Sequence, residues 1–176
     1  FDAADRRTEI RAELPDGTNV TTCVYDDFDQ LVQVTESNAS GERVTVYTYD
    51  GNGNRRSVAV TPGETFHYVY GNENRLLAVT NPAGVVLARY SYDAAGNCVM
   101  KVTPDEAVRY EYDERNLLKR VIGATNYIEY AYNGIGARVS KTVNGVVTRY
   151  VQDLSADVWQ TLEERDASGG VLAVYT

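Results

Sequence analysis

Apolar and polar residues alternate along most of this chain, in short runs separated by turn-forming residues. In the segment 107–112 (AVRYEY), valine and two tyrosines occupy one set of alternate positions, and arginine and glutamate lie between them. A period of two residues is typical of a β-strand with one packed face and one face in water. A helical period is only weakly suggested, at Asp157–Glu164. The pattern therefore predicts an all-β chain.

A pair of tyrosines separated by one residue recurs along the chain. The complete pairs are Tyr47/Tyr49, Tyr68/Tyr70, Tyr90/Tyr92, Tyr110/Tyr112 and Tyr130/Tyr132. Their second tyrosines are 21, 22, 20 and 20 residues apart. The pattern continues in weakened form at Phe1, Tyr25 and Gln152. About seven to eight repeats of roughly 20–25 residues thus fill the chain, a period typical of repeat proteins.

The residues after each second tyrosine favour a tight turn. Asp50, Asp93 and Asp113 come directly after it, and Asp or Asn at the start of a turn can accept backbone N–H groups. In seven units the fourth residue after the aromatic is Gly, Asn or Asp, the types that best tolerate a left-handed backbone, whereas the eighth unit breaks the rule with Ala156. These fourth residues are Asp5, Asp29, Gly53, Asn74, Gly96, Asn116 and Gly136. The spacing predicts a type I turn closed by a left-handed residue, which makes a short hairpin loop.

Each repeat also holds a second turn, which contains all the prolines of the chain. Pro15, Pro62, Pro82 and Pro104 are each expected at the second turn position, where their fixed φ fits. Two turns per repeat predict two strands per repeat, joined as an antiparallel meander. Examples of the outgoing strands are Gln30–Thr35, Arg75–Thr80 and Cys98–Thr103, and examples of the returning strands are Val44–Tyr49, Val85–Tyr92 and Ala107–Tyr112.

Such a meander is a single long sheet with one aromatic face. Because neighbouring strands lie about 4.8 Å apart, tyrosine pairs on every second strand recur at about 10 Å, and residues of the outgoing strands must fill the space between them. A sheet of about fourteen or more strands is expected to curl or spiral through its twist. Its two unpaired edges favour self-association.

Charge and length exclude several classes of function. The chain has 176 residues and a formal net charge of −8, which disfavours nucleic acid as a partner. No apolar run approaches the roughly 20 residues that cross a bilayer. The chain opens at Phe1 without a methionine or a signal peptide. We therefore expect a fragment of a longer protein, forming one repeat domain over residues 1–176 with a divergent last repeat at 150–176.

The segment Tyr90-Ser91-Tyr92-Asp93-Ala94-Ala95-Gly96-Asn97 resembles the signature of the YD-repeat, or RHS-repeat, family, and the resemblance covers nearly the whole chain. That family includes bacterial Rhs polymorphic toxins, the cocoon-forming component of insecticidal toxin complexes, and the animal teneurins. The resemblance implies a β-ribbon that spirals into a hollow shell, which in the toxins encloses a polypeptide effector. It also implies a secreted or cell-surface protein whose partners are an effector, other shell segments or a carbohydrate.

The self-cleaving element of toxin members has no matching motif here, so autoproteolysis is assigned to no residue. The repeat-signature residues are interpreted as structural. They are Tyr47, Tyr49, Asp50, Gly53, Tyr68, Tyr70, Asn74, Tyr90, Tyr92, Asp93, Gly96, Tyr110, Tyr112, Asp113, Asn116, Tyr130, Tyr132 and Gly136. No catalytic residue, metal ligand or cofactor site is predicted. The ligand-binding residues are left open.

Other residues carry weaker signals. The acidic turns at Asp26–Asp29 and Asp50–Asn54 lack the spacing of known calcium loops. Cys23 and Cys98 occupy non-equivalent repeat positions, which favours two small buried side chains over a disulfide. His67 falls on the non-aromatic face and is expected to lie at a surface. The sequence therefore predicts a non-enzymatic scaffold that encapsulates or displays a toxin or effector, or mediates surface contact.

Two rival interpretations stay open at this point. A carbohydrate-binding or adhesive module would use the tyrosine rings as a sugar platform. An enzyme would need a cleft with converging carboxylates of perturbed pKa, since acidic residues are abundant in this chain.

Overall fold

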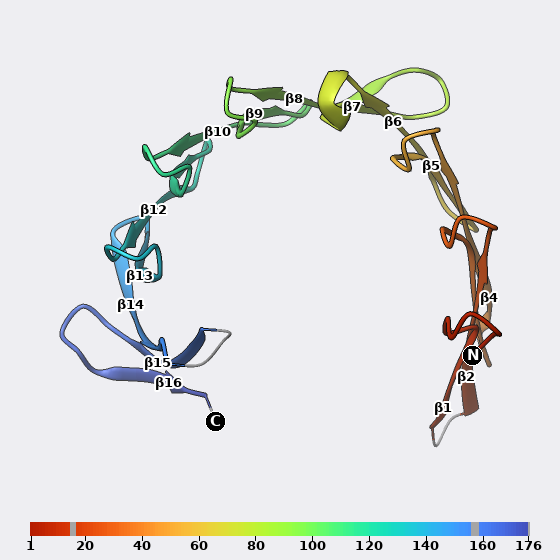
Figure 1. Cartoon of the computed structure of the whole chain (residues 1–176), viewed down its shortest axis with the longest axis horizontal. Helices are drawn as coiled ribbons and strands as arrows, with labels where there is room; N and C mark the ends of the chain where they lie inside the picture. The colour runs from red at the N-terminus through yellow and green to blue at the C-terminus, as the bar shows by residue number, and fades with distance from the viewer. Residues whose placement is uncertain (15–16, 156–158, 176) are drawn as a thin grey trace. The chain divides into compact units, whose positions relative to one another are not determined.

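A computed structural model describes residues 1–14, 17–155 and 159–175. Sixteen strands within these ranges form one sheet, whose hydrogen-bonded order follows the order of the chain from β1 to β16. Figure 1 shows consecutive strands joined as hairpins. The predicted all-β antiparallel meander, with two strands per repeat, is thereby confirmed.

The chain divides into two compact units, Phe1–Ala88 and Arg89–Thr176. The first unit contains β1 (Glu9–Leu14), β2 (Gly17–Tyr25), β3 (Leu31–Asn38), β4 (Gly41–Tyr49), β5 (Arg55–Thr61), β6 (Thr65–Tyr70), the short 3-10 helix η1 (Asn72–Asn74) and β7 (Leu76–Thr80). The division falls within β8 (Val86–Tyr92). The second unit continues with β9 (Cys98–Val102), β10 (Ala107–Tyr112), β11 (Leu118–Ile122), β12 (Tyr127–Tyr132), β13 (Arg138–Val143), β14 (Val146–Asp153), β15 (Gln160–Arg165) and β16 (Val171–Val174).

The predicted strands agree with these bounds to within a few residues, and the end of the chain gives one correction. The helix weakly suggested at Asp157–Glu164 is wrong for residues 160–164, because Gln160–Arg165 is strand β15. Residues 156–158 lie outside the described residues. Pairing with β14 and β16 overrides the local pattern of this segment.

A β-bulge interrupts the pairing just before the second aromatic position of each repeat. In the Tyr112 repeat, Glu111 pairs with Arg120 but Tyr112 pairs with Leu118, so Lys119 is an extra residue on β11. The same shift lies between Val24/Tyr25, Thr48/Tyr49, Val69/Tyr70, Ser91/Tyr92, Ala131/Tyr132 and Val151/Gln152. Because a bulge increases the local twist of a strand pair, each repeat carries one fixed site of extra twist.

Few side chains are buried in the described part of the chain. The buried apolar residues are Val58, Ala78, Ala88 and Ala137. All the tyrosines of the five pairs are half-buried. The expectation of one packed face and one wet face is therefore met only in part, because a single layer of strands leaves both faces accessible. Side chains are covered mainly by their neighbours on the same face.

The second turns of the repeats differ from one another. The turn at Pro15 lies outside the described residues. The Thr61–Pro62 peptide bond is cis. At Asn81–Val85 the chain forms a five-residue loop with a left-handed Gly84, like the loops that follow the tyrosines. Asn144 and Gly145 both have positive φ, 48° and 89°, as a type I′ turn requires.

Candidate functional site: the corners and the tyrosine ladder

The loop after each second aromatic, which we call a corner with positions 1 to 5, is closed by two backbone hydrogen bonds. In the Asp93 corner, the N–H of Asp93 donates to the carbonyl of Asn97 (3.0 Å), and the N–H of Gly96 donates to the carbonyl of Asp93 (3.1 Å). The same two bonds close the corners that begin at Asp2, Asp26, Asp50, Asp113 and Asn133.

The side chain at position 1 holds the corner from inside. Oδ1 of Asp113 accepts the backbone N–H groups of Arg115 and Leu117, each at 2.9 Å. Oδ1 of Asn133 accepts the same two N–H groups in its own corner, at 3.1 and 2.9 Å. A short side chain that ends in an oxygen acceptor is therefore what position 1 needs, and charge is not essential.

Position 4 has a left-handed backbone in all seven corners from Asp2 to Ala137. The φ values are 59° at Asp5, 62° at Asp29, 83° at Gly53, 57° at Asn74, 90° at Gly96, 60° at Asn116 and 90° at Gly136. The corner at Gly71–Arg75 differs from the others, because Glu73 also has a positive φ of 62°. Gly71 supplies no side-chain acceptor there, and Glu73 instead forms an ion pair with Arg75.

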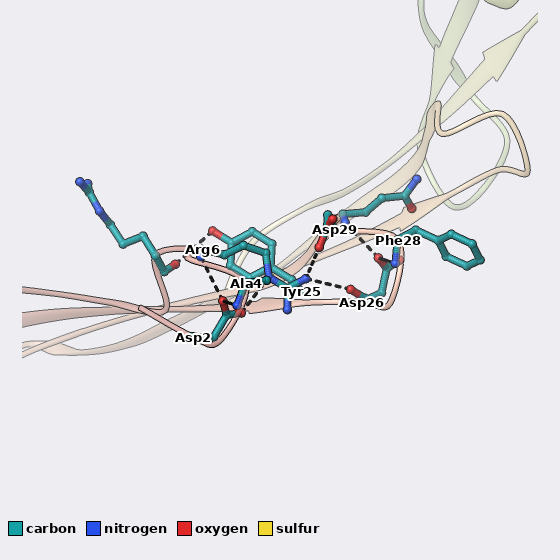
Figure 2. Close-up of polar contacts among 9 residues, drawn as sticks. Asp2, Ala4, Arg6, Tyr25, Asp26, Phe28 and Asp29 are labelled. Atoms are coloured by element: carbon teal, nitrogen blue, oxygen red, sulfur yellow. Dashed lines mark hydrogen bonds and ion pairs between the residues drawn. The ribbon is translucent and has the colours of Figure 1, made fainter.

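Successive corners are also joined to each other, as Figure 2 shows for the first two. Arg6, at position 5 of the first corner, is held at Nε by Oδ2 of Asp2 (2.7 Å). Its Nη1 donates to the carbonyl of Asp26 (3.1 Å) and to Oδ1 of Asp29 (2.6 Å), both in the second corner. Its guanidinium also lies 5.0 Å from the ring centre of Tyr25. One side chain thus ties two hairpins together.

The same contact recurs with other residue types. Nδ2 of Asn54 donates to Oδ1 of Asn74 (2.9 Å), and Nδ2 of Asn97 donates to Oδ1 of Asn116 (2.9 Å). In each case position 5 of one corner donates to position 4 of the next. Arg115 makes a variant of this link by donating to the carbonyl of Asn133 (3.0 Å). Side-chain contacts therefore join the first corner to the second, the corner at Asp50 to the corner at Gly71, and the three corners from Asp93 to Asn133 to one another.

In four repeats the second tyrosine is anchored to the chain segment that follows the preceding corner. The hydroxyl groups donate to backbone carbonyls, Tyr25 to Arg7 (3.0 Å), Tyr49 to Leu31 (2.7 Å), Tyr112 to Cys98 (3.1 Å) and Tyr132 to Leu118 (2.9 Å). Each of these carbonyls belongs to the residue just after position 5 of the preceding corner. Gln152 replaces tyrosine in the last repeat, and its Nε2 donates to the equivalent carbonyl of Arg138 (2.8 Å).

These carbonyls need a donor because the backbone pairing between repeats stops short of the corners. Between β9 and β10, for example, the paired residues end at Met100 and Arg109. The carbonyl of Cys98 lies beyond that point, and the hydroxyl of Tyr112 bonds to it in place of a backbone N–H. The tyrosines thus extend the connection between repeats to the corner edge of the sheet.

Arginine side chains fill the spaces between first tyrosines in part of the ladder. The guanidinium carbon of Arg138 lies 5.5 Å from the ring centre of Tyr130 and 4.9 Å from that of Tyr150. Arg55 lies 4.8 Å from the ring centre of Tyr47. These distances are within the range of cation–π contacts. Residues of the outgoing strands are expected to fill the spaces of about 10 Å between tyrosines, and these arginines do so here. Their guanidinium groups cover ring faces on which a sugar would have to stack.

The opposite face of the second unit carries a row of alternating charges. Glu111 lies between Arg109 (2.8 Å) and Arg120 (3.2 Å), and Arg120 also contacts Glu129 (2.9 Å). The row crosses β10, β11 and β12 through residues that are directly opposite each other. Because the pairs are partly exposed, each contributes little stability by itself, but the alternation favours this strand register.

The corner carboxylates predict a loss of stability in acid. Hydrogen bonds lower the pKa of Asp50 below its usual 3.8, first from the Asn54 side chain and then from the backbone of Asn54. The pKa of Asp113 is lowered chiefly by the backbone N–H of Leu117. A pKa that is lower in the folded state stabilises the fold above pH 3.8, and this stabilisation is lost as the pH falls through the folded pKa.

We therefore expect the urea midpoint of the chain to fall between pH 5 and pH 2.5. The variant Asp50→Asn keeps an oxygen acceptor without a titrating group, as Asn133 does naturally. It should lose less stability over this range than the parent chain, whereas the matched variant Asp27→Asn, at an exposed corner position, should behave like the parent. If the urea midpoint fell equally in all three chains between pH 5 and pH 2.5, the role assigned to the corner carboxylate would be contradicted.

The remaining candidate residues are not gathered into a reaction centre. His67 is exposed, and Cys23 and Cys98 are half-buried free thiols rather than fully buried ones. Among the described residues, no group of three or more His, Cys, Asp and Glu side chains is placed to hold a metal ion, and no helix has the length and apolar character to cross a membrane. An open depression of about 400 Å³ on β2–β4 is lined by Asn19, Glu36, Glu42 and Arg43, among other residues.

Sequence reasoning placed the turn residues but missed their contacts with each other. Position 5 is a side-chain donor in five corners and apolar in two, so the aligned repeats gave only a partial signal; the donors are Arg6, Gln30, Asn54, Arg75 and Asn97, and the apolar residues are Leu117 and Ala137. The hydroxyl contacts were less accessible, because they depend on the bulge and on where the pairing between repeats ends.

Comparison with known proteins places these features in a family. The family model described as teneurin YD-shell matches residues 1–155. Two curated proteins are 32% identical to this chain over 158 residues, "tRNA nuclease WapA" of Bacillus subtilis and "tRNA3(Ser)-specific nuclease WapA" of Bacillus spizizenii. The matches cover 86% of this chain and only 6% of each relative.

Solved structures of toxin complexes share the fold. The crystal structure of TcdB2-TccC3 without its hypervariable C-terminal region has a TM-score of 0.58 and 14% identity, over 85% of this chain and 9% of that one. A Photorhabdus luminescens Tc holotoxin pore has a TM-score of 0.51 and 13% identity, over 89% of this chain and 9% of that one.

Proposed function

Since the chain belongs to the teneurin YD-shell family, we propose that it is a wall segment of a β-sheet shell and that it acts as a structural scaffold. The finer proposal is that the shell encloses or displays a toxin or effector polypeptide, or mediates contact at a cell surface, outside the cell that makes it. The repeat-signature tyrosines, aspartates and glycines then serve the wall itself.

The observation that carries this proposal is the double connection between neighbouring hairpins. Strand pairing joins them along the middle of the sheet. The hydroxyl of Tyr112 and the amide of Asn97 join them at the corner edge, where that pairing has ended. A wall that separates an interior from solvent needs continuous contacts across its whole width, whereas a binding or catalytic module needs converging groups in one cleft.

The relatives' names concern activities of much longer proteins. This chain spans 6% of the two nucleases, so a nuclease activity in those proteins does not have to involve the matching segment. The acidic net charge of −8 also opposes a direct role in binding tRNA. We propose that an effector, where one is present, lies outside residues 1–176.

Protease protection tests the enclosure. In a longer protein that carries this segment, the effector should resist a protease while the wall is intact and become sensitive when Tyr112→Ala weakens the wall. Tyr112→Phe, which retains the ring, should leave most of the protection in place. Equal sensitivity of the effector in all three proteins would contradict the enclosure.

A glycan array on the 176-residue chain separates the scaffold from the carbohydrate-binding alternative. We expect no binding, because arginine side chains cover ring faces of Tyr47, Tyr130 and Tyr150. Affinity for a sugar that disappears on Tyr110→Ala would favour the alternative instead.

A further inference from the structure

The first and last strands of the sheet each have one edge that is unpaired among the described strands. The N–H of Cys23 donates to the carbonyl of Thr8 (2.8 Å), so residue 8 and alternate residues after it face β2. The backbone groups of Arg11 therefore face the outer edge of β1. In the same way, the N–H of Tyr175 donates to the carbonyl of Leu162 (2.9 Å), so the backbone groups of Val174 face the outer edge of β16.

The sequences at these two edges complement each other. Tyr175-Thr176 followed by Phe1-Asp2 reads Tyr-x-aromatic-Asp, the motif that precedes the corners at Asp50, Asp93 and Asp113. The spacing also fits the repeat, because Phe1 would lie 25 positions after Gln152, and Tyr25 lies 24 positions after Phe1. In the complete repeats, the strand residues that come before the second aromatic end in the first aromatic residue and one further residue. The C-terminal residues of one copy could therefore take the place of those strand residues beside Phe1 of another copy.

The register of the repeats predicts how two such edges would pair. In the complete repeats, a first tyrosine lies opposite the residue nine positions after the second tyrosine, as Tyr47 lies opposite Val58 and Tyr110 lies opposite Val121. The equivalent residue after Phe1 is Ile10. Tyr175 would then lie opposite Ile10, an aromatic residue against a β-branched one, as in the repeats of Tyr47, Tyr68 and Tyr110. In the repeats of Tyr90 and Tyr130 the opposite residue is a lysine.

The same register brings the outward-facing backbone groups together. With Tyr175 opposite Ile10, the antiparallel register places Val174 opposite Arg11, and these are the two residues whose backbone groups face the outer edges. A register shifted by one residue would lose this match. Backbone hydrogen bonding and the repeat pattern therefore agree, although they come from different observations.

The exposed fractions of Ile10 and Tyr175 show that neither side chain has a cross-strand partner of this kind among the described residues of its own chain. Ile10 is 44% exposed and Tyr175 is 49% exposed, whereas Val58, which has its tyrosine opposite, is 9% exposed. Val171, Leu172 and Val174 on β16 are also 56–62% exposed. Covering these side chains would supply an apolar contribution in addition to the backbone bonds.

We propose that β16 of one copy of this chain pairs with β1 of a second copy, antiparallel and in the register of the repeats. The contact joins two different edges, so it is heterologous, and each copy added to an open chain of copies presents a new edge. In a longer protein the neighbouring repeats would occupy the same edges, so the proposal concerns the chain of 176 residues. It depends on repeat register and not on the enclosure of an effector.

Sedimentation velocity with two proline variants tests the pairing. Val174→Pro removes the outward N–H of β16, and Arg11→Pro removes that of β1, while Val174→Ala and Arg11→Ala keep them. We expect the average mass of the parent and of both alanine variants to rise with concentration beyond that of a dimer. Each proline variant alone should stay monomeric, because one of its two edges is blocked.

An equimolar mixture of the two proline variants should give a dimer and nothing larger, because each retains the edge that the other has lost. A monomeric parent, or a proline variant that dimerises by itself, would overturn the proposal. As a measurement that needs no variant, energy transfer from a dye at the C-terminus of one parent copy to a dye at the N-terminus of another should rise with concentration. Its absence would equally overturn the pairing.

Discussion

Replacement of Tyr112 by alanine is expected to lower the free energy of unfolding by about 2–3 kcal/mol, less than the full cost of removing a buried aromatic ring because Tyr112 is half-buried. The change removes the ring and also the hydroxyl that bonds to the carbonyl of Cys98. That carbonyl lies beyond the end of the pairing between β9 and β10. Urea unfolding followed by circular dichroism measures the loss.

Two phenylalanine variants separate the ring from the hydroxyl. Tyr112→Phe should cost about 1 kcal/mol, the usual net contribution of one hydrogen bond. Tyr110→Phe, on the same strand, should cost less, because the hydroxyl of Tyr110 makes no hydrogen bond among the described residues. If the two phenylalanine variants were equally stable, the anchoring role of the second tyrosine would be refuted.

Valine at Gly53 is expected to destabilise the chain by about 1–2 kcal/mol, because a side chain at a left-handed φ of 83° meets the backbone. The added Cβ would also lie 3.4 Å from Nε2 of Gln30 in the preceding corner. Chemical denaturation of the folded chain measures the difference.

Gly51 in the same corner provides the matched control. It has no positive φ, and nothing lies within 4 Å of a Cβ built there. Gly51→Val should therefore change the stability by no more than about 0.5 kcal/mol. Similar losses at Gly51 and Gly53 would show that position 4 has no special backbone requirement.

The fold could be read from the sequence because its determinants are local and repeated. The fourth residue after each aromatic, such as Gly96 or Asn116, reports a left-handed backbone by its residue type alone, and seven such positions at a regular spacing define the hairpins. The corner at Gly71 was harder to foresee, since the left-handed φ of Glu73 arises where position 1 has no acceptor.

The connections between hairpins could not be derived in the same way. The bond from Tyr112 to Cys98 spans 14 residues, and Arg6 donates to a backbone carbonyl 20 positions away and to a carboxylate 23 positions away. Such contacts depend on the bulge and on the end of the pairing between repeats, which no local pattern specifies. The assignment of the tyrosines to the wall therefore required the structure, and their role in a shell is a proposal that builds on it.

Backbone nuclear Overhauser contacts in the isolated chain test the central claim, that corners and tyrosines hold one uninterrupted antiparallel ribbon. The account predicts cross-strand contacts only between consecutive strands, with Arg120 opposite both Glu111 and Glu129. Contacts between strands that are not consecutive, or helical contacts within the segments that carry the tyrosine pairs, would contradict it.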